Sequence, residues 1–248
     1  MTVASDEPGR QELIENVTLS GPVLSVLVPA LNAARTLPTT LAALNTTRPS
    51  PVIGGFEVVV IDGGSTDTTT ELAASLGVRV IAAQRGRGGQ LAAGAAACRG
   101  DWLLFLHADT RLGPGWLEAV SAHMANTRER AGYFRFALDS EDPRARRLER
   151  LVAWRCRFLG LPYGDQGLLV HRELLNEVGG IRPLPLMEDV DLVRRLGQRR
   201  LALLPADALT SAERWERDGW LRRSARNFAC LALYFGGMPP GMIAKLYS

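Results

Sequence analysis

Short apolar runs alternate with segments of helical spacing through the first half of the chain. The apolar runs predict buried strands over residues 23–28, 56–61, 78–82 and 102–106. The segments between them predict helices over residues 31–44, 66–76 and 90–98. Because strands separated by helices must be parallel and joined by crossovers, this order predicts an α/β domain with a mostly parallel central sheet flanked by helices.

Beyond residue 113 the pattern is looser. We expect helices over residues 116–127, 144–158, 188–197 and 220–235, and strands over residues 133–138, 164–170 and 201–204. No repeat or low-complexity linker divides the chain, so we predict a single domain over residues 21–215. A polar lead over residues 1–20 would precede it, and an amphipathic helical extension over residues 216–248 would follow it.

The composition is that of an ordinary globular protein. Of 248 residues, 46% are hydrophobic and 22% are charged, which excludes a disordered tail, a collagen-like repeat and a disulfide scaffold. The three cysteines, Cys98, Cys156 and Cys230, lie far apart, which indicates reduced thiols and no structural zinc site. The first residues lack the apolar run of a signal peptide, and no stretch approaches the roughly 18 apolar residues of a membrane span. We therefore expect a cytoplasmic protein, with peripheral contact at the inner face of the membrane as the alternative.

Polar or glycine-rich segments follow all four strands of the first half, at residues 29–32, 62–67, 85–89 and 107–109. Ligands of open parallel sheets bind at the carboxyl ends of the strands, so these segments together predict a nucleotide pocket. The glycine segment fits neither GxGxxG, because Leu91 stands at the third position, nor a P-loop. Its two arginines, Arg85 and Arg87, are suited to neutralising a diphosphate, although a solvated turn is the structural alternative.

Two carboxylates stand out by their position. Asp109 follows an apolar strand, where it could hold Mg²⁺ or Mn²⁺ bridged to phosphate oxygens, or simply cap a turn. On the helix over residues 188–197, Asp189 shares a face with apolar positions three, four and seven residues later. Asp191 instead aligns with two arginines, which predicts a solvated ion-pair face. Asp189 is therefore expected to face the interior or a cleft, as a general base would. Burial would raise the pKa of Asp189, whereas the helix N-terminus would lower it.

At these residues the sequence resembles the family 2 glycosyltransferases, enzymes of the GT-A fold. Residues 26–32 look like the first strand of that family and its Pro-x-x-Asn exit, and residues 59–67 resemble its Asp-rich DGSTD turn. Residues 107–109 stand at the place of its DxD motif, residues 188–189 at its ED motif, and residues 211–215 at its later xxxRW segment. The LHADT wording at residues 106–110 is similar to a small bacterial subgroup.

The resemblance implies a metal-assisted, inverting glycosyltransferase that moves a sugar from a nucleotide diphosphate sugar, which we expect to be UDP-linked, to an acceptor hydroxyl. Asp62 would bind the base or ribose, Asp109 would ligate the Mg²⁺ or Mn²⁺ cofactor, and Asp189 would take the acceptor proton. The implied nucleotide-sugar site comprises Pro29, Ala30, Asn32, Asp62, Arg85, Arg87, His107, Ala108 and Asp109. The implied acceptor and sugar side comprises Gly164, Asp165, Gln166, Glu188, Arg214 and Trp215.

Three positions depart from the family pattern. His107 replaces the first Asp of DxD, which could weaken the dependence on metal. Gly63 replaces the second Asp of a DDGS turn, which removes one nucleotide contact, and Ala92 stands where relatives often have Asn. None of the three removes the expected base, Asp189.

Two basic amphipathic helices, over residues 144–158 and 220–235, interleave arginines with large apolar residues. We expect them to pack on the domain or against a second copy of the chain, with an anionic membrane or a lipid phosphate as the alternative partner. Residues 135–226 hold eighteen arginines and fourteen acids, whereas the residues before 134 hold ten and twelve. This excess favours a phosphate-bearing or lipid-linked acceptor, even though the codon preference of a GC-rich genome explains the use of arginine itself.

Other functions fit less well. A nucleotidyltransferase of the same fold usually has a glycine-rich basic loop after the first strand, where residues 29–35 offer Ala, Leu and Asn. A catalytically silent binding module would not need both Asp109 and Asp189. Nucleic acid is not an expected partner, because the basic residues are interspersed with 26 acids and show no aromatic platform for bases.

Overall fold

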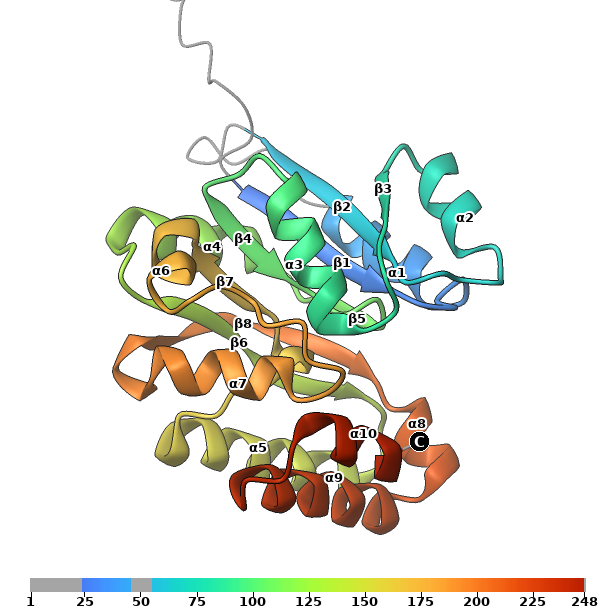
Figure 1. Cartoon of the computed structure of the whole chain (residues 1–248), viewed down its shortest axis with the longest axis vertical. Coiled ribbons are helices and arrows are strands. Elements are labelled where there is room, and N and C mark those ends of the chain that lie inside the picture. Colours follow the sequence, from blue (N-terminus) through green and yellow to red (C-terminus); the bar gives the residue numbers. More distant parts are fainter. Residues whose placement is uncertain (1–23, 46–54, 248) are drawn as a thin grey trace, which may run out of the picture.

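The computed structural model describes residues 24–45 and 55–247, so the expected polar lead lies outside the described residues. Its centre is one eight-stranded sheet of order β3-β2-β1-β4-β7-β6-β8-β5 (Figure 1). The strands are β1 (Leu24–Ala30), β2 (Phe56–Asp62), β3 (Arg79–Ala82), β4 (Trp102–Phe105), β5 (Thr110–Leu112), β6 (Ala131–Asp139), β7 (Leu168–His171) and β8 (Leu201–Ser211). The predicted α/β architecture with a mostly parallel sheet is confirmed.

The direction of the strands brings many of their carboxyl ends to one edge. Strands β3, β2, β1 and β4 pair in parallel, and β7 is antiparallel to both β4 and β6. Strand β6 therefore runs in the same direction as β4, and β8 pairs parallel to β6. The end of β8 thus lies at the same edge as the ends of β1, β2 and β4, which is where ligands of such sheets bind.

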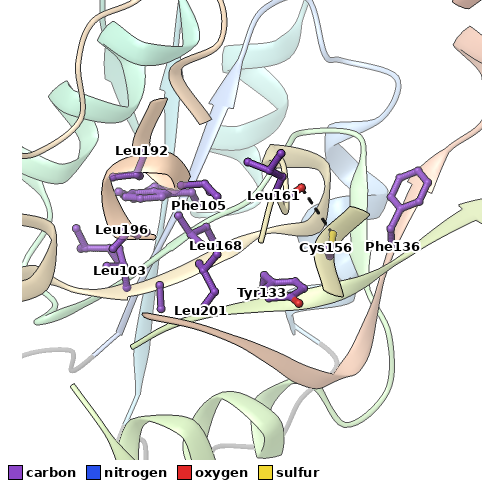
Figure 2. Packing of buried hydrophobic residues seen from close by; sticks show 14 of the residues in the cluster. Leu103, Phe105, Tyr133, Phe136, Cys156, Leu161, Leu168, Leu192, Leu196 and Leu201 are labelled. Carbon is purple, nitrogen blue, oxygen red and sulfur yellow. Dashed lines mark hydrogen bonds between the residues drawn. The ribbon is translucent and has the colours of Figure 1, made fainter. Parts of the chain in front are cut away.

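Helices cover both faces of this sheet. They are α1 (Leu37–Asn45), α2 (Thr69–Ser75), α3 (Arg87–Ala97), α4 (Trp116–Asn126), α5 (Pro143–Leu159), α6 (Arg172–Glu177), α7 (Glu188–Leu196), α8 (Glu213–Asp218), α9 (Trp220–Phe235) and α10 (Pro240–Tyr247). Since side chains alternate along a strand, Leu27 belongs to a core that includes residues of α3, α5 and α7, whereas Val26 and Val28 belong to a core that includes residues of α1 and α4. Figure 2 shows the first of these two cores, in which Phe105 of β4 lies close to Leu192 of α7.

Several predicted boundaries were wrong. Residues 31–36 form a loop and not the start of a helix, because Asn32 adopts a left-handed conformation (φ 50°) that helices do not contain. Residues 164–170 are not one strand: a 3-10 turn, Gly164–Gln166, comes first, and Gly167 (φ 61°) separates it from β7. The last strand is much longer than residues 201–204, and β5, α6, α8 and α10 were not predicted.

Helices α5, α9 and α10 lie together at one end of the molecule (Figure 1). Helix α9 begins and ends where the sequence predicted. The three helices leave large apolar side chains in contact with solvent: Leu151, Trp154, Phe158, Leu221, Phe228, Phe235, Met242 and Leu246. No helix within the described residues is both long and apolar enough to cross a bilayer.

Candidate active site

Asp62 organises the turn that follows β2. Its carboxylate accepts hydrogen bonds from the backbone N–H groups of Gly64 (3.0 Å) and Ser65 (3.1 Å), and its side chain is buried. Such a short-range carboxylate bond to the following backbone is the normal way an Asp holds a tight turn. In this structure Asp62 therefore fixes the shape of the turn after β2.

Asn32 joins the loop after β1 to the turn after β2. Its Oδ1 accepts a 2.8 Å hydrogen bond from the backbone N–H of Thr66, and its own N–H donates to Oγ of Ser65 at 2.9 Å. Asn tolerates the left-handed conformation better than most residues, which explains the residue type at this position. The two strand ends are thus held side by side.

Gln90 fixes the same strand ends from the side of α3, and the sequence analysis did not identify it. Its Nε2 donates to the carbonyl oxygens of Ala30 (2.8 Å) and Ile61 (2.7 Å), and its side chain is buried. A Cβ at Gly63 would lie 3.0 Å from Cδ of Gln90. The Gly at the place of the family's second Asp therefore makes room for the Gln90 amide.

A cavity of about 410 Å³ opens at this edge, and we call it the donor-side cavity. Of the nine residues implied for nucleotide-sugar binding, all but Asp62 line it: Pro29, Ala30, Asn32, Arg85, Arg87, His107, Ala108 and Asp109. Arg35, Arg214 and Arg217 also line it, so five arginines face two acids, Asp109 and Glu213. Its size is that of an ordinary small-molecule site, and its charge suits an anion such as a diphosphate.

A second cavity of about 330 Å³, the acceptor-side cavity, adjoins the first. Of the residues implied for the acceptor side, it is lined by Asp165, Arg214 and Trp215, together with Asp189. Residues common to the two cavities are Arg87, His107, Asp109, Ser211 and Arg214. The cavities therefore meet at the end of β8 and at the loop after β4.

The other residues implied for the acceptor side lie behind this cavity. Gly164 and Glu188 line a small apolar cavity of about 30 Å³ beneath it. Gln166 is buried: its Nε2 donates to the Phe134 carbonyl (3.1 Å), and its Oε1 accepts from the Tyr163 N–H (3.2 Å). Gln166 thus holds the 3-10 turn, and its neighbour Asp165 faces the cavity.

Asp189 lies in the first turn of α7 and faces the acceptor-side cavity. Its Oδ2 accepts a hydrogen bond from the N–H of Gly164 (2.8 Å), and its Oδ1 accepts one from the N–H of Val190 (2.8 Å). Burial acts to raise the pKa of Asp189, but the Arg87 charge and the Gly164 N–H outweigh it and hold that pKa below its ordinary value. The carboxylate is therefore ionised at neutral pH.

Arg87 lines both cavities and contacts residues on either side of Asp189's site, Glu188 of α7 and His107 of the loop after β4. Its Nε forms a 2.8 Å ion pair with Glu188, and its guanidinium lies 3.2 Å from Nε2 of His107. Burial, with the Arg87 charge, lowers the pKa of His107 to about 4, so this imidazole is neutral at pH 7. Burial also raises the pKa of Glu188 to about 7.

The prediction that Asp191 lies on a solvated face was wrong, although its pairing with an arginine of the same helix was correct. Asp191 is buried and forms ion pairs with Arg182 (3.0 Å) and Arg195 (2.7 Å). Arg195 also donates a 2.8 Å hydrogen bond to the Gly180 carbonyl, so the segment before α7 folds over this face of the helix. Helical spacing alone does not reveal such a covering segment.

Asp165 and Tyr163 complete the polar part of the acceptor-side cavity. Within the described part of the chain, Oδ1 of Asp165 is buried without a hydrogen-bond partner, and burial raises the pKa of Asp165 to about 6. The Arg155 guanidinium lies 3.6 Å from the centre of the Tyr163 ring, a cation–π contact. The sequence analysis missed Tyr163 because nothing in its local pattern distinguishes it from a core aromatic residue.

Arg214 and Trp215 border the cavity from the start of α8. Arg214 lies 3.5 Å from Oδ2 of Asp109, which places it beside the carboxylate expected to bind metal. Trp215 stacks on Trp220 with 6.0 Å between ring centres, and Arg223 lies over its ring at 5.2 Å. The indole is thus fixed as a wall of the cavity.

Asp109 is the residue best placed to hold a divalent cation. No group of three or more His, Cys, Asp or Glu side chains within residues 24–45 and 55–247 could bind a metal ion by itself. The Asp109 side chain is 18% exposed at the junction of the two cavities and offers hard oxygen ligands. Mg²⁺ is commonly bound by one or two carboxylates with substrate phosphates and water, so this donor fits a metal shared with a diphosphate.

Comparison with known proteins identifies the family of the chain. The model of glycosyl transferase family 2 matches residues 25–182. The chain belongs to this family. The fold of this family member is shared by the Staphylococcus aureus TarS 1–349 structure (TM-score 0.59, 16% identity, 76% of this chain and 60% of that chain). It is also shared by glucosyl-3-phosphoglycerate synthase from Mycobacterium tuberculosis in complex with Mn²⁺ and UDP-glucose (TM-score 0.55, 22% identity, 77% and 70%).

A curated relative matches the chain over a shorter region. The PGL/p-HBAD biosynthesis glycosyltransferase of Mycobacterium tuberculosis strain H37Ra is 36% identical over 101 residues. This region covers 38% of the chain and 38% of the relative.

Proposed function

We propose that this glycosyltransferase moves a sugar from a UDP-linked donor to a hydroxyl of an acceptor, with inversion at the anomeric carbon and with Asp189 as general base. The donor occupies the donor-side cavity and the acceptor occupies the acceptor-side cavity. One observation carries the proposal: the two cavities meet at Asp109, and Asp189 lines the acceptor-side cavity next to this junction. The Mn²⁺ and UDP-glucose in the glucosyl-3-phosphoglycerate synthase structure support a UDP-linked donor and a divalent metal.

The reaction is a single displacement. The acceptor oxygen forms a bond to the anomeric carbon from the face opposite the diphosphate, and its proton passes to a carboxylate oxygen of Asp189. The bond between the anomeric carbon and the diphosphate oxygen breaks, and its electron pair leaves with UDP. Because the pKa of Asp189 is lowered, the base is ready as a carboxylate and takes the proton as the acceptor oxygen attacks.

The donor-side arginines neutralise the charge of the leaving group. Arg85 comes from the loop before α3, Arg87 is the first residue of α3, and Arg214 belongs to α8, so they approach the anion from different elements. Asp109 would hold the Mg²⁺ or Mn²⁺, with His107 beside it as a neutral imidazole. When bound, the metal stabilises the negative charge of the departing diphosphate.

A panel of nucleotide sugars read by thermal shift, with and without Mn²⁺ or Mg²⁺, tests this proposal. We expect stabilisation by a UDP-linked sugar that depends on the metal and is lost in Asp109→Asn. Release of pyrophosphate from a nucleoside triphosphate would instead indicate a nucleotidyltransferase. Failure of every nucleotide to bind in calorimetry would indicate a silent binding module.

The exposed face of α5, α9 and α10 supports peripheral contact with an anionic membrane. Residues 219–248 contain four basic residues and no acid. On α5, Trp154 and Phe158 are 55% and 58% exposed, and Arg157 lies over the Phe158 ring at 5.7 Å. Basic residues next to exposed aromatic and aliphatic side chains are typical of helices that lie on anionic lipid surfaces.

A further inference from the structure

The acceptor-side cavity has two chemically different sides. At the sheet edge it is polar, with the carboxylates of Asp165 and Asp189. The opposite wall comes from α5 and α9 and contains five apolar residues, Leu148, Val152, Phe228, Cys230 and Leu231, beside Arg155, Arg223, Ser224 and Asn227. A ligand that fills this cavity therefore meets carboxylates on one side and a wall with a large apolar share on the other.

The two arginines of this wall do not make it polar. Arg155 donates a 2.9 Å hydrogen bond to the Leu161 carbonyl and stacks on Tyr163. Arg223 forms a 2.9 Å ion pair with Asp218 and lies over Trp215. Both guanidinium groups are thus held by protein partners, Arg155 by a carbonyl and a ring and Arg223 by an ion pair, although Nε of Arg223 is buried without a hydrogen-bond partner among the described residues. The side chains of both arginines therefore extend the wall.

We infer that the acceptor has an apolar body, an alkyl chain or an aromatic ring, next to the hydroxyl that receives the sugar. This inference rests on the proposed function and specifies its acceptor. A body covered with hydroxyl groups would leave them without partners against Val152 and Leu231, and each such loss opposes binding. An apolar body removes its own surface and that of the wall from water, which favours binding.

The cavity has a way in for such a body. Val152 and Cys230 are 6% and 5% exposed, whereas Phe228 is 72% exposed and lines the same cavity. The wall thus continues from the buried interior to the apolar outer face of α9. At about 330 Å³ the cavity is at the small end of ligand sites, enough for a short chain or one ring, and a longer chain would leave past Phe228.

Calorimetry with alkyl β-glucosides tests the inference on the full chain. Butyl, hexyl and octyl glucoside are titrated below their aggregation concentrations, in the presence of UDP and Mn²⁺, with glucose as the reference. We expect the dissociation constant to fall about fourfold for each methylene group that enters the cavity. A dissociation constant that does not depend on chain length overturns the inference.

Two matched variants locate the site of binding. Ser224 lines the cavity and is half-buried, whereas its neighbour Ala225 is exposed and lies outside the residues that line it. Ser224→Trp should fill the cavity and weaken octyl glucoside binding at least about tenfold, and Ala225→Trp should leave it within about twofold. Equal loss in both variants overturns the inference, and if Ser224→Trp does not fold, the chain-length series on the unaltered protein decides alone.

The donor is measured separately in the same experiments. UDP should bind Ser224→Trp and the unaltered chain equally well, because Ser224 does not line the donor-side cavity. If UDP binds but alkyl chains have no effect, the inference on the acceptor fails and the proposed function stands. If UDP itself does not bind, the proposed function fails.

Discussion

The backbone N–H of Gly164 donates a 2.8 Å hydrogen bond to Oδ2 of Asp189. This bond joins the 3-10 turn before β7 to the first turn of α7, two segments that are 25 residues apart in the sequence. A Cβ at position 164 would lie 2.5 Å from Nε2 of His107 and 3.2 Å from Oδ2 of Asp189. Only glycine lets the turn approach both side chains, so residue 164 positions the proposed base.

Gly164→Ala should therefore impair transfer while leaving the fold intact. The Cβ would force the His107 ring to shift and would displace Asp189 by a few tenths of an ångström. We expect this to lower kcat about 10- to 100-fold, because proton transfer depends on geometry. Steady-state kinetics with the donor found in the nucleotide panel measure the effect. Gly89→Ala is the matched control, and it should keep full activity because its Cβ would have no neighbour closer than 3.9 Å. Since Gly89 lies in α3, alanine there should raise the free energy of unfolding by up to about 1 kcal/mol. Full activity in Gly164→Ala would contradict the role given to this contact.

Asp189→Asn should abolish the proton transfer. We expect kcat to fall about 10²- to 10⁴-fold, with UDP affinity within about twofold, because Asp189 does not line the donor-side cavity. Asp191→Asn is the control on the same helix. It should cost about 1–3 kcal/mol of unfolding free energy by weakening a buried ion pair, yet keep turnover in the folded fraction. Comparable turnover in Asp189→Asn and the unaltered chain would exclude Asp189 as the base.

The different environments of these two aspartates indicate what the sequence could and could not predict. Helical spacing placed Asp189 on the same face of α7 as Leu192 and Val193, and in the structure Asp189 borders a cavity together with these two residues. It failed for Asp191, because the segment that buries it comes from residues 178–182 and carries no periodic pattern. The direction of the Asp189 pKa also required the structure, since it depends on Arg87 and on the Gly164 N–H from distant parts of the chain.

The stability of the protein should depend on pH through Asp165. The pKa of Asp165 is about 6 in the fold because of burial, above the ordinary value of 3.8, so the folded state holds its proton more tightly than the unfolded state. The sign follows: stability is lost as pH rises from about 4 to above 6. Asp165→Asn should raise the unfolding free energy by about 1–2 kcal/mol near pH 7 and by much less near pH 4. Urea unfolding at both pH values measures this difference.

Asp218→Asn is the control of opposite sign. A hydrogen bond from Arg217 lowers the pKa of Asp218 to about 2, so its stabilising contribution is complete above the ordinary value of 3.8 and lost only as pH falls toward 2. Between pH 4 and pH 7 this variant should therefore be destabilised by a constant amount. If Asp165→Asn were equally pH-independent, the buried, partly unpartnered carboxylate would not be the cause.

Flotation with anionic vesicles tests the proposed membrane contact. The unaltered chain should float with vesicles rich in phosphatidylglycerol at low salt, and binding should weaken as salt rises. Replacing Trp154 and Phe158 by Ser should reduce binding at least about tenfold, whereas Leu203→Ser, an equally exposed apolar residue on β8, should not. A stable dimer in sedimentation, with no flotation, would assign this face to a second copy of the chain.

The helices that form this face also show where the sequence analysis fell short. Their amphipathic character and the bounds of α9 were correctly predicted. No sequence pattern assigns their inner residues to a cavity, because Val152 and Leu231 come together only through the packing of α5 and α9. Local sequence patterns predicted the ends of the strands and singled out Asp62, Asp109 and Asp189 as candidate site residues. The contacts of Gln90 and Tyr163 were not predicted, because no pattern in the neighbouring sequence indicates them.

The apolar wall of the acceptor-side cavity has a consequence for the fate of the donor. Water and the acceptor compete for the same anomeric carbon, and both would reach it through the junction at His107 and Asp109. An acceptor with an apolar body displaces water from the wall as it binds, whereas an empty cavity leaves the junction wet. If the proposed acceptor binds there, the ratio of transfer to hydrolysis should depend on how well hydrocarbon fills the space between α5 and α9.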